Sequence, residues 1–217
     1  MKLNVLIISL ILPIAAYSQF WLGLKGGVNF STVKFDSPNF NSQFKNYLKL
    51  YPGVNYGIDG DLYFTEALSL KINCLYTQKG FKYDQTYIYG YKRYNYFLAS
   101  FAGKIDLNPF EKNVFALSLA PYLAYWKSGE QLEGYRKTHV ILRDQMYLKA
   151  DTNFAYNRID AGVVFAVYLL HSINRKMRFN LSFGYELGMV STAKENVLGT
   201  FNRNFFIDIA VVRRIKL

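Results

Sequence analysis

Apolar side chains recur at every second position of this chain, over stretches of about ten residues. In Leu22–Ser31, for example, Leu, Leu, Gly, Val and Phe alternate with Gly, Lys, Gly, Asn and Ser. Successive side chains of a strand point to opposite faces, so this period predicts strands with one apolar and one polar face. We expect eight of them, at residues 22–31, 54–64, 68–77, 97–107, 115–125, 159–169, 178–189 and 204–214.

The length of these strands indicates a membrane protein. Strands of globular proteins average about 5–6 residues, whereas a tilted membrane-spanning strand needs about 9–11. The connections alternate between short turns and long loops, the loops being expected at 34–50, 81–93, 127–157 and 191–201. That alternation is typical of outer-membrane barrels, with short periplasmic turns and long extracellular loops. The sequence therefore predicts an all-β fold, an eight-stranded antiparallel up-and-down transmembrane β-barrel in a bacterial outer membrane.

The first residues have the pattern of a cleaved secretory signal peptide, 1–18. Lys2 precedes an apolar stretch, and Ala16-Tyr17-Ser18 forms a small-x-small cleavage site. The alternative, a membrane anchor, would need about 20 apolar residues, more than this stretch contains. We expect residues 19–217 to form one barrel domain. A single cysteine, Cys74, excludes an internal disulfide and a cysteine-rich zinc site.

Alternation alone leaves open which face points inward. A soluble carrier barrel turns its apolar face in, and a membrane barrel turns it out. Here the polar face combines Gly, Ala and Ser with charges of both signs, which suits the narrow lumen of eight strands. We expect a plugging network of ion pairs in the lumen, formed by Lys25, Asp59, Asp61, Lys71, Lys104, Asp106, Asp160, Arg178, Glu186 and Asp208. An acid/base or cation site and a conducting path are the alternatives.

The first strand opens with Gly23-Leu24-Lys25-Gly26-Gly27-Val28-Asn29, just after Ser18-Gln19. Together with the eight-strand pattern, it resembles the PorT-like outer-membrane β-barrel family of Bacteroidota. The resemblance covers essentially all of 19–217 and depends on the whole pattern, because the individual motifs are short. It implies an eight-stranded barrel in the outer membrane. One member of that family serves type IX protein secretion and most have no assigned activity, so the resemblance implies no active residue.

The candidates for catalysis are few. The glycines near residue 25 lack the spacing of a phosphate-binding loop and precede no helix. His139, with Asp144 or Ser128, is the one combination that resembles a general base and its partner. With no second independent signature of catalysis, we interpret His139 as a surface histidine in a basic loop and predict neither an enzyme nor a cofactor.

The chain is basic, with 26 Lys and Arg against 15 Asp and Glu, and its expected loops share this excess. The expected signal peptide and barrel disfavour a nucleic-acid partner. We expect the partner to be outer-membrane lipid or lipopolysaccharide, or an envelope or secretion-complex protein. The candidate contact residues in the loops are Lys92, Arg93, Arg136, Lys137, His139 and Arg143. The predicted function is a non-enzymatic structural or interaction role. The alternatives are a small-ligand carrier, recovered in soluble form, and a lipid-modifying enzyme, inactivated by replacing His139.

Overall fold

The computed structural model describes residues 19–37, 39, 44, 46–138, 140–146, 157–191 and 199–215, without the side chains of 144–146. The predicted signal peptide at 1–18 and the candidate His139 lie outside the described residues. In the described part of the chain, no helix is long and apolar enough to cross a membrane.

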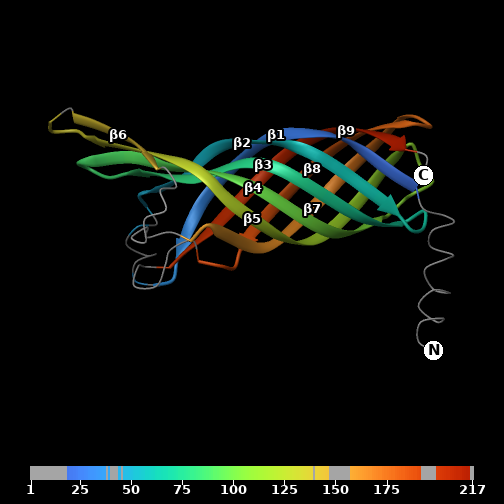
Figure 1. Cartoon of the computed structure of the whole chain (residues 1–217), viewed down its shortest axis with the longest axis horizontal. Coiled ribbons are helices and arrows are strands. Elements are labelled where there is room, and N and C mark those ends of the chain that lie inside the picture. The colour runs from blue at the N-terminus through green and yellow to red at the C-terminus, as the bar shows by residue number, and fades with distance from the viewer. Residues whose placement is uncertain are drawn as a thin grey trace.

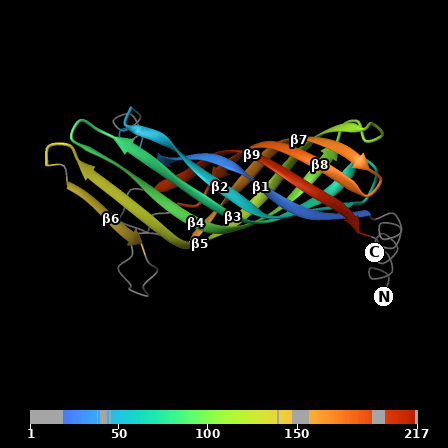
Figure 2. The same ribbon diagram turned by 90° about the horizontal axis from the view of Figure 1, so that it is seen from above.

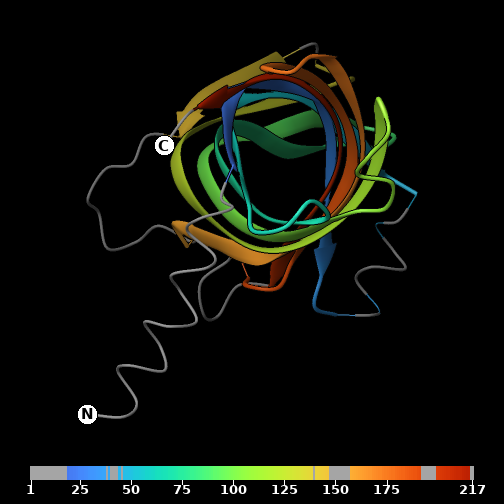
Figure 3. The ribbon, with the colours of Figure 1, turned by 90° about the vertical axis from the view of Figure 1, so that its right-hand side faces the viewer.

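The described strands form one antiparallel sheet that closes on itself (Figure 3). They are β1 (Gln19–Phe35), β2 (Leu48–Tyr63), β3 (Leu68–Asp84), β4 (Ile88–Asp106), β5 (Asn113–Tyr135), β6 (Val140–Met146), β7 (Ile159–Asn174), β8 (Met177–Gly188) and β9 (Thr200–Ile215). Each barrel strand pairs with its neighbours, and β1–β9 pairing completes the ring. The strand β6 pairs only with the far part of β5, so the ring itself consists of eight strands, as the sequence predicts.

The alternation of side chains separates an apolar outside from a polar inside. Each barrel strand exposes apolar side chains outward, for example Leu24, Ile58, Leu68, Phe101, Leu119, Phe165, Phe183 and Ile209. The inner face carries buried lysines, carboxylates and amides beside small apolar residues such as Ala102, Ala116 and Ala120. Water does not favour so apolar an outer surface, but hydrocarbon does, so the described faces fit a membrane barrel and not a soluble carrier.

Glycine permits the close approach of strands in so narrow a ring. At Gly57, on the inner face of β2, an added Cβ would overlap the carbonyl oxygen of Cys74 on β3. At Gly103, on the outer face of β4, an added Cβ would meet open space. Glycine is therefore required by packing at the first position and not at the second.

Two of the expected loops are wrong, because they are largely strands. The expected loop 81–93 is a hairpin of β3 and β4 turning at 85–87, and 127–157 contains the end of β5 and all of β6. Beyond the membrane an outward face need not be apolar, so the hydrophobic period fades while backbone pairing continues. We call residues 48–50, 81–84, 88–93, 129–135 and 140–146 the protruding sheet. Figures 1 and 2 show it extending away from the barrel, at the end opposite to the start of β1.

Candidate functional site in the lumen and the protruding sheet

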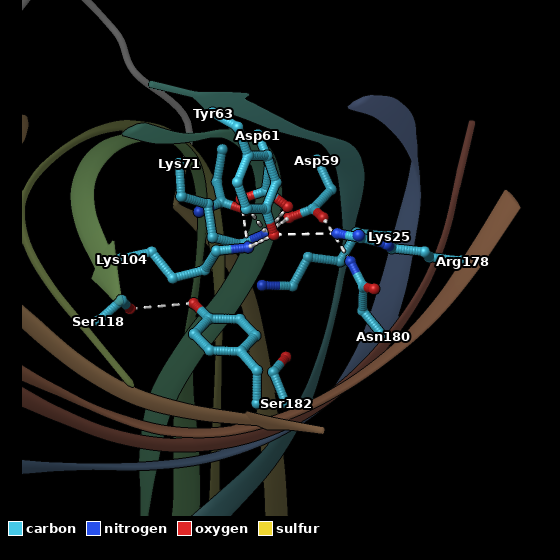
Figure 4. Close-up of polar contacts among 12 residues, drawn as sticks. Lys25, Asp59, Asp61, Tyr63, Lys71, Lys104, Ser118, Arg178, Asn180 and Ser182 are labelled. Carbon is cyan, nitrogen blue, oxygen red and sulfur yellow. Dashed lines mark hydrogen bonds and ion pairs between the residues drawn. The ribbon is translucent and has the colours of Figure 1, made fainter. Parts of the chain in front are cut away.

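The lumen near the short turns 64–67 and 107–112 contains a chain of alternating charges. Lys71 Nζ lies 2.6 Å from Asp59 and 3.4 Å from Asp61. Lys104 Nζ lies 3.1 Å from Asp61 and 3.6 Å from Asp106. Figure 4 shows both lysines inside the barrel, directed toward Asp59 and Asp61. All five side chains are buried, so each charge depends on its neighbours for compensation.

Tyr63 connects this chain of charges to the far wall of the barrel. Its hydroxyl accepts from Lys104 Nζ at 2.8 Å and from Arg178 Nη1 at 3.1 Å, and it donates to Asp106 at 2.7 Å. The Arg178 guanidinium also lies 4.3 Å from the centroid of the Trp21 ring. These contacts join β2, β4, β8 and β1 across the interior. Tyr63 and Arg178 also line a hollow of about 750 Å³ at this end, together with residues of the turns 64–67 and 107–112.

A second ion pair lies further along the lumen. Lys25 Nζ lies 2.8 Å from Asp208, which also accepts from Asn55 Nδ2 at 2.6 Å. Both charged side chains are almost completely buried.

The third cluster centres on Lys79, a residue absent from the predicted network. Its Nζ lies 3.1 Å from Asp160 and 2.7 Å from Glu186, and 4.5 Å from the centroid of the Tyr122 ring. Asp160 also accepts from the Tyr122 hydroxyl at 3.0 Å and from Asn202 Nδ2 at 2.9 Å. The period of two, continued two residues past Thr77, would have placed Lys79 on the inner face.

These clusters leave little free space between them. The void between them, lined among others by Lys25, Asp208, Tyr168 and Phe206, measures about 20 Å³. A single water molecule needs ~10–15 Å³ of such space, so this void has room for about one. All ten predicted lumen residues lie on the inner wall, where the structure joins them into separate clusters rather than one continuous network.

In the protruding sheet, three donors from neighbouring strands converge on the buried carboxylate of Glu130. The Tyr91 hydroxyl and Arg93 Nη2 each lie 2.6 Å from it, and Arg143 Nε lies 2.8 Å away. The hydrogen bond from Tyr91, with those from the arginines, holds the pKa of Glu130 below its usual range. This cluster connects β4, β5 and β6 through side-chain hydrogen bonds. Arg93 and Arg143 were both predicted as contact residues, and both have a partner within the protein.

A second cluster of the protruding sheet lies around Asp84. Its carboxylate is 2.8 Å from Lys49 Nζ and also pairs with Arg136. Hydrogen bonding from Lys49 and the Arg136 charge hold the pKa of Asp84 below its usual range. Lys137 Nζ lies 4.5 Å from the Tyr87 ring centroid, and the half-buried Lys92 lies on β4. Of the predicted contact residues whose side chains are described, Arg136, Lys137 and Arg143 are exposed.

The candidate catalytic group lies largely outside the described part of the chain. His139 and the Asp144 side chain lie outside it, and Ser128 Oγ accepts a hydrogen bond from Asn95 at 3.0 Å. Among the described residues, no cluster of three or more His, Cys, Asp or Glu side chains is arranged to hold a metal ion.

Comparison with known proteins gives one family and several structural neighbours. The family model described as outer membrane protein beta-barrel domain matches residues 15–194. Ail of Yersinia pestis, solved with the heparin analogue sucrose octasulfate, is 11% identical, with 91% of this chain and 99% of Ail covered and a TM-score of 0.44. Neisserial surface protein A is 8% identical (90% and 97% covered, TM-score 0.48), and OprG of Pseudomonas aeruginosa is 7% identical (92% and 97% covered, TM-score 0.47). No curated protein matched the sequence.

Proposed function

This chain belongs to the outer membrane protein beta-barrel domain family, and from that premise we propose that it is a plugged, non-enzymatic barrel. Its role is to hold the protruding sheet outside the outer membrane as an interaction surface for a component of the cell envelope. An accessory part in protein secretion, implied by the PorT-like resemblance, is the narrower form of this proposal.

The observation that carries the proposal is the filled lumen. Buried ion pairs on Lys71, Lys79 and Lys104 occupy the interior, and the void between the clusters holds about one water. A ligand carried between these clusters would need a cavity of ~300–1,000 Å³. The hollow of about 750 Å³ lies beyond them, at the short-turn end beside residues 64–67. We therefore favour a closed barrel over a carrier or a channel, and place the function on the surface.

The proposed orientation follows the usual asymmetry of outer-membrane barrels. Short turns face the periplasm in this class, and the longer connections face outside. The described short turns, 64–67 and 107–112, lie opposite the protruding sheet. The sheet therefore faces the extracellular side in our proposal.

Two measurements test these points. Purified protein in detergent should shift its mobility in gels on boiling. Reconstituted in a planar bilayer, it should give no unitary currents, and steady unitary currents would refute the plug. In a Cys74→Ser background, Lys137→Cys should react with a membrane-impermeant maleimide on intact cells, whereas Lys112→Cys, in the turn after β4, should react only after permeabilisation. The reverse pattern of labelling would overturn the orientation.

A further inference from the structure

A hollow on the protruding sheet combines cations with tyrosine rings. It measures about 290 Å³ and is lined by Lys49, Lys82, Arg136, Tyr83, Tyr89 and Tyr91, together with the single carboxylate of Asp84. We call it the basic cleft. Its residues come from β2, β3, β4 and the turn after β5, so the pairing of the protruding sheet assembles it. Its volume is near the lower end of small-molecule sites, ~300–1,000 Å³, and suits one ring-sized group.

The charges of the basic cleft are unbalanced. Asp84 pairs with both Lys49 and Arg136, so one carboxylate serves two cations. For Lys82, the contact in the structure is the Tyr51 ring, whose centroid lies 5.9 Å from Nζ, and no ion pair to it is found among the described residues. The cleft therefore carries an excess of positive charge, which favours an anionic ligand.

The donors of these cations also remain accessible. The side chains of Lys49 and Arg136 are 58% and 52% exposed. An ammonium has three N–H donors and a guanidinium five, more than the two oxygens of Asp84 occupy. A phosphate or carboxylate in the cleft would accept from the remaining donors through charge-assisted hydrogen bonds.

The tyrosines of the cleft are held in place by the sheet beneath them. The Tyr89 ring occupies the space that a Cβ at Gly134 would need, and the Tyr83 ring does the same at Gly90. Tyr91 packs on Tyr51 with ring centroids 5.6 Å apart. A fixed tyrosine offers a flat apolar face and a polar hydroxyl, which matches a sugar ring with its C–H face and hydroxyl groups.

The height of the cleft separates it from the lipid headgroups. The rings of Tyr56, Tyr76 and Phe97 form a row on the outer face, with centroids 5.0 and 6.0 Å apart, as at a membrane interface. Lys82 lies six residues further along β3 than Tyr76. At ~3.3 Å per residue and a tilt of roughly 40°, this is about 15 Å. The headgroup layer is only ~5–8 Å thick on each side.

We propose that the basic cleft binds an anionic saccharide, with a phosphate or carboxylate group on Lys49, Lys82 and Arg136 and a sugar ring against the tyrosines. The inference rests on the proposed function of the protruding sheet as an interaction surface, and names the class of its ligand. The height of the cleft assigns it to saccharide chains beyond the headgroups and not to the lipid phosphates.

Calorimetric titration of the full chain in detergent tests this proposal. The probes are the deacylated, phosphorylated core oligosaccharide of lipopolysaccharide, a galacturonate oligomer, a neutral dextran oligomer and intact lipopolysaccharide. At least one anionic oligosaccharide should bind saturably and the dextran should not, and added salt should weaken the binding. Binding of intact lipopolysaccharide alone would assign the site to lipid and overturn the proposal, as would saturable binding of none of the anionic probes.

Matched variants locate the site. Lys82→Gln should weaken binding about tenfold and Lys82→Gln with Arg136→Gln about a hundredfold. Lys127→Gln, an exposed lysine at the same end whose Nζ lies over the Phe97 ring, should bind like the unchanged protein. Equal affinities of all three variants would refute the cleft. The boiling shift of each variant shows whether it is folded. Currents in a planar bilayer test the plug independently of ligand binding. Failure of this inference is therefore distinguishable from failure of the proposed function.

Discussion

Replacing Lys79 with methionine tests whether the ion pairs of the lumen stabilise the folded barrel. Methionine is of similar length but carries no charge. In the structure Lys79 Nζ lies 3.1 Å from Asp160 and 2.7 Å from Glu186, and the lysine side chain is completely buried. The variant therefore leaves two carboxylates in the lumen without their cation.

The expected loss of stability follows from the partners that remain. Breaking a buried ion pair by removing one member destabilises a protein by ~3–5 kcal/mol. Asp160 keeps the hydroxyl of Tyr122 and the amide of Asn202 as donors, whereas no donor other than Lys79 is found for Glu186 Oε2 within the described residues. Most of the penalty therefore falls on Glu186, and we expect the lower end, about 3 kcal/mol. For a chain of this size that corresponds to a fall of about 6–12 °C in melting midpoint.

The assay is the boiling shift in gels, followed as a function of temperature in detergent at neutral pH. The double variant Lys79→Met with Glu186→Gln removes the cation together with the carboxylate that most needs it, and should recover at least half of the loss. Lys127→Met, on the outer face beside Phe97, is the control and should melt within about 2 °C of the unchanged protein. Equally small effects for Lys79→Met would refute the reasoning. A double variant no more stable than Lys79→Met would show that the unpaired carboxylate is not the cause.

Three further predictions concern other parts of the molecule. Lys104→Ala, which removes ion pairs to Asp61 and Asp106, should lower the melting midpoint by several degrees without opening a path, and currents in a planar bilayer would contradict this. Gly57→Ala should reduce the yield of folded barrel, because the new Cβ would overlap the Cys74 carbonyl, whereas Gly103→Ala should fold normally; equal yields on gels would count against the packing argument. The pKa of Glu130 is lowered by folding, so its contacts contribute stability above its unfolded value of about 4.5 and lose it as the pH falls through the folded value. The protection of the β6 amides against hydrogen exchange, relative to the intrinsic exchange rate at each pH, should therefore fall in acid below about pH 4.5, and the idea fails if Glu130→Gln shows the same pH step.

The barrel was predictable because hydrocarbon imposes a strict rule on every spanning strand. Each residue that faces lipid must be apolar, so Leu24, Ile58 and Phe101 recur in step with the backbone, and the sequence alone counts the eight strands. The same parity marks the inner face, where Lys25, Asp59 and Lys71 lie.

The protruding sheet was missed because that rule ends at the membrane. Residues such as Lys82, Asp84 and Arg93 interrupt the hydrophobic period, although the backbone of β3 and β4 continues to pair. The register between distant strands could not be predicted from the sequence either. That Lys79 on β3 meets Asp160 on β7 and Glu186 on β8 depends on the closure and stagger of the ring, which no local pattern encodes.

The length of β3, β4 and β5 fixes how far the protruding sheet stands from the lipid. Because these strands pair with one another, none can be lengthened alone without losing its partner at the added residues. An odd number of added residues would exchange the inner and outer faces of everything beyond the insertion. A β-bulge, as at the register shifts of the β2–β3 and β4–β5 pairs, takes up a single added residue. Without a further bulge, the reach of this protein changes in steps of two residues, made in neighbouring strands together.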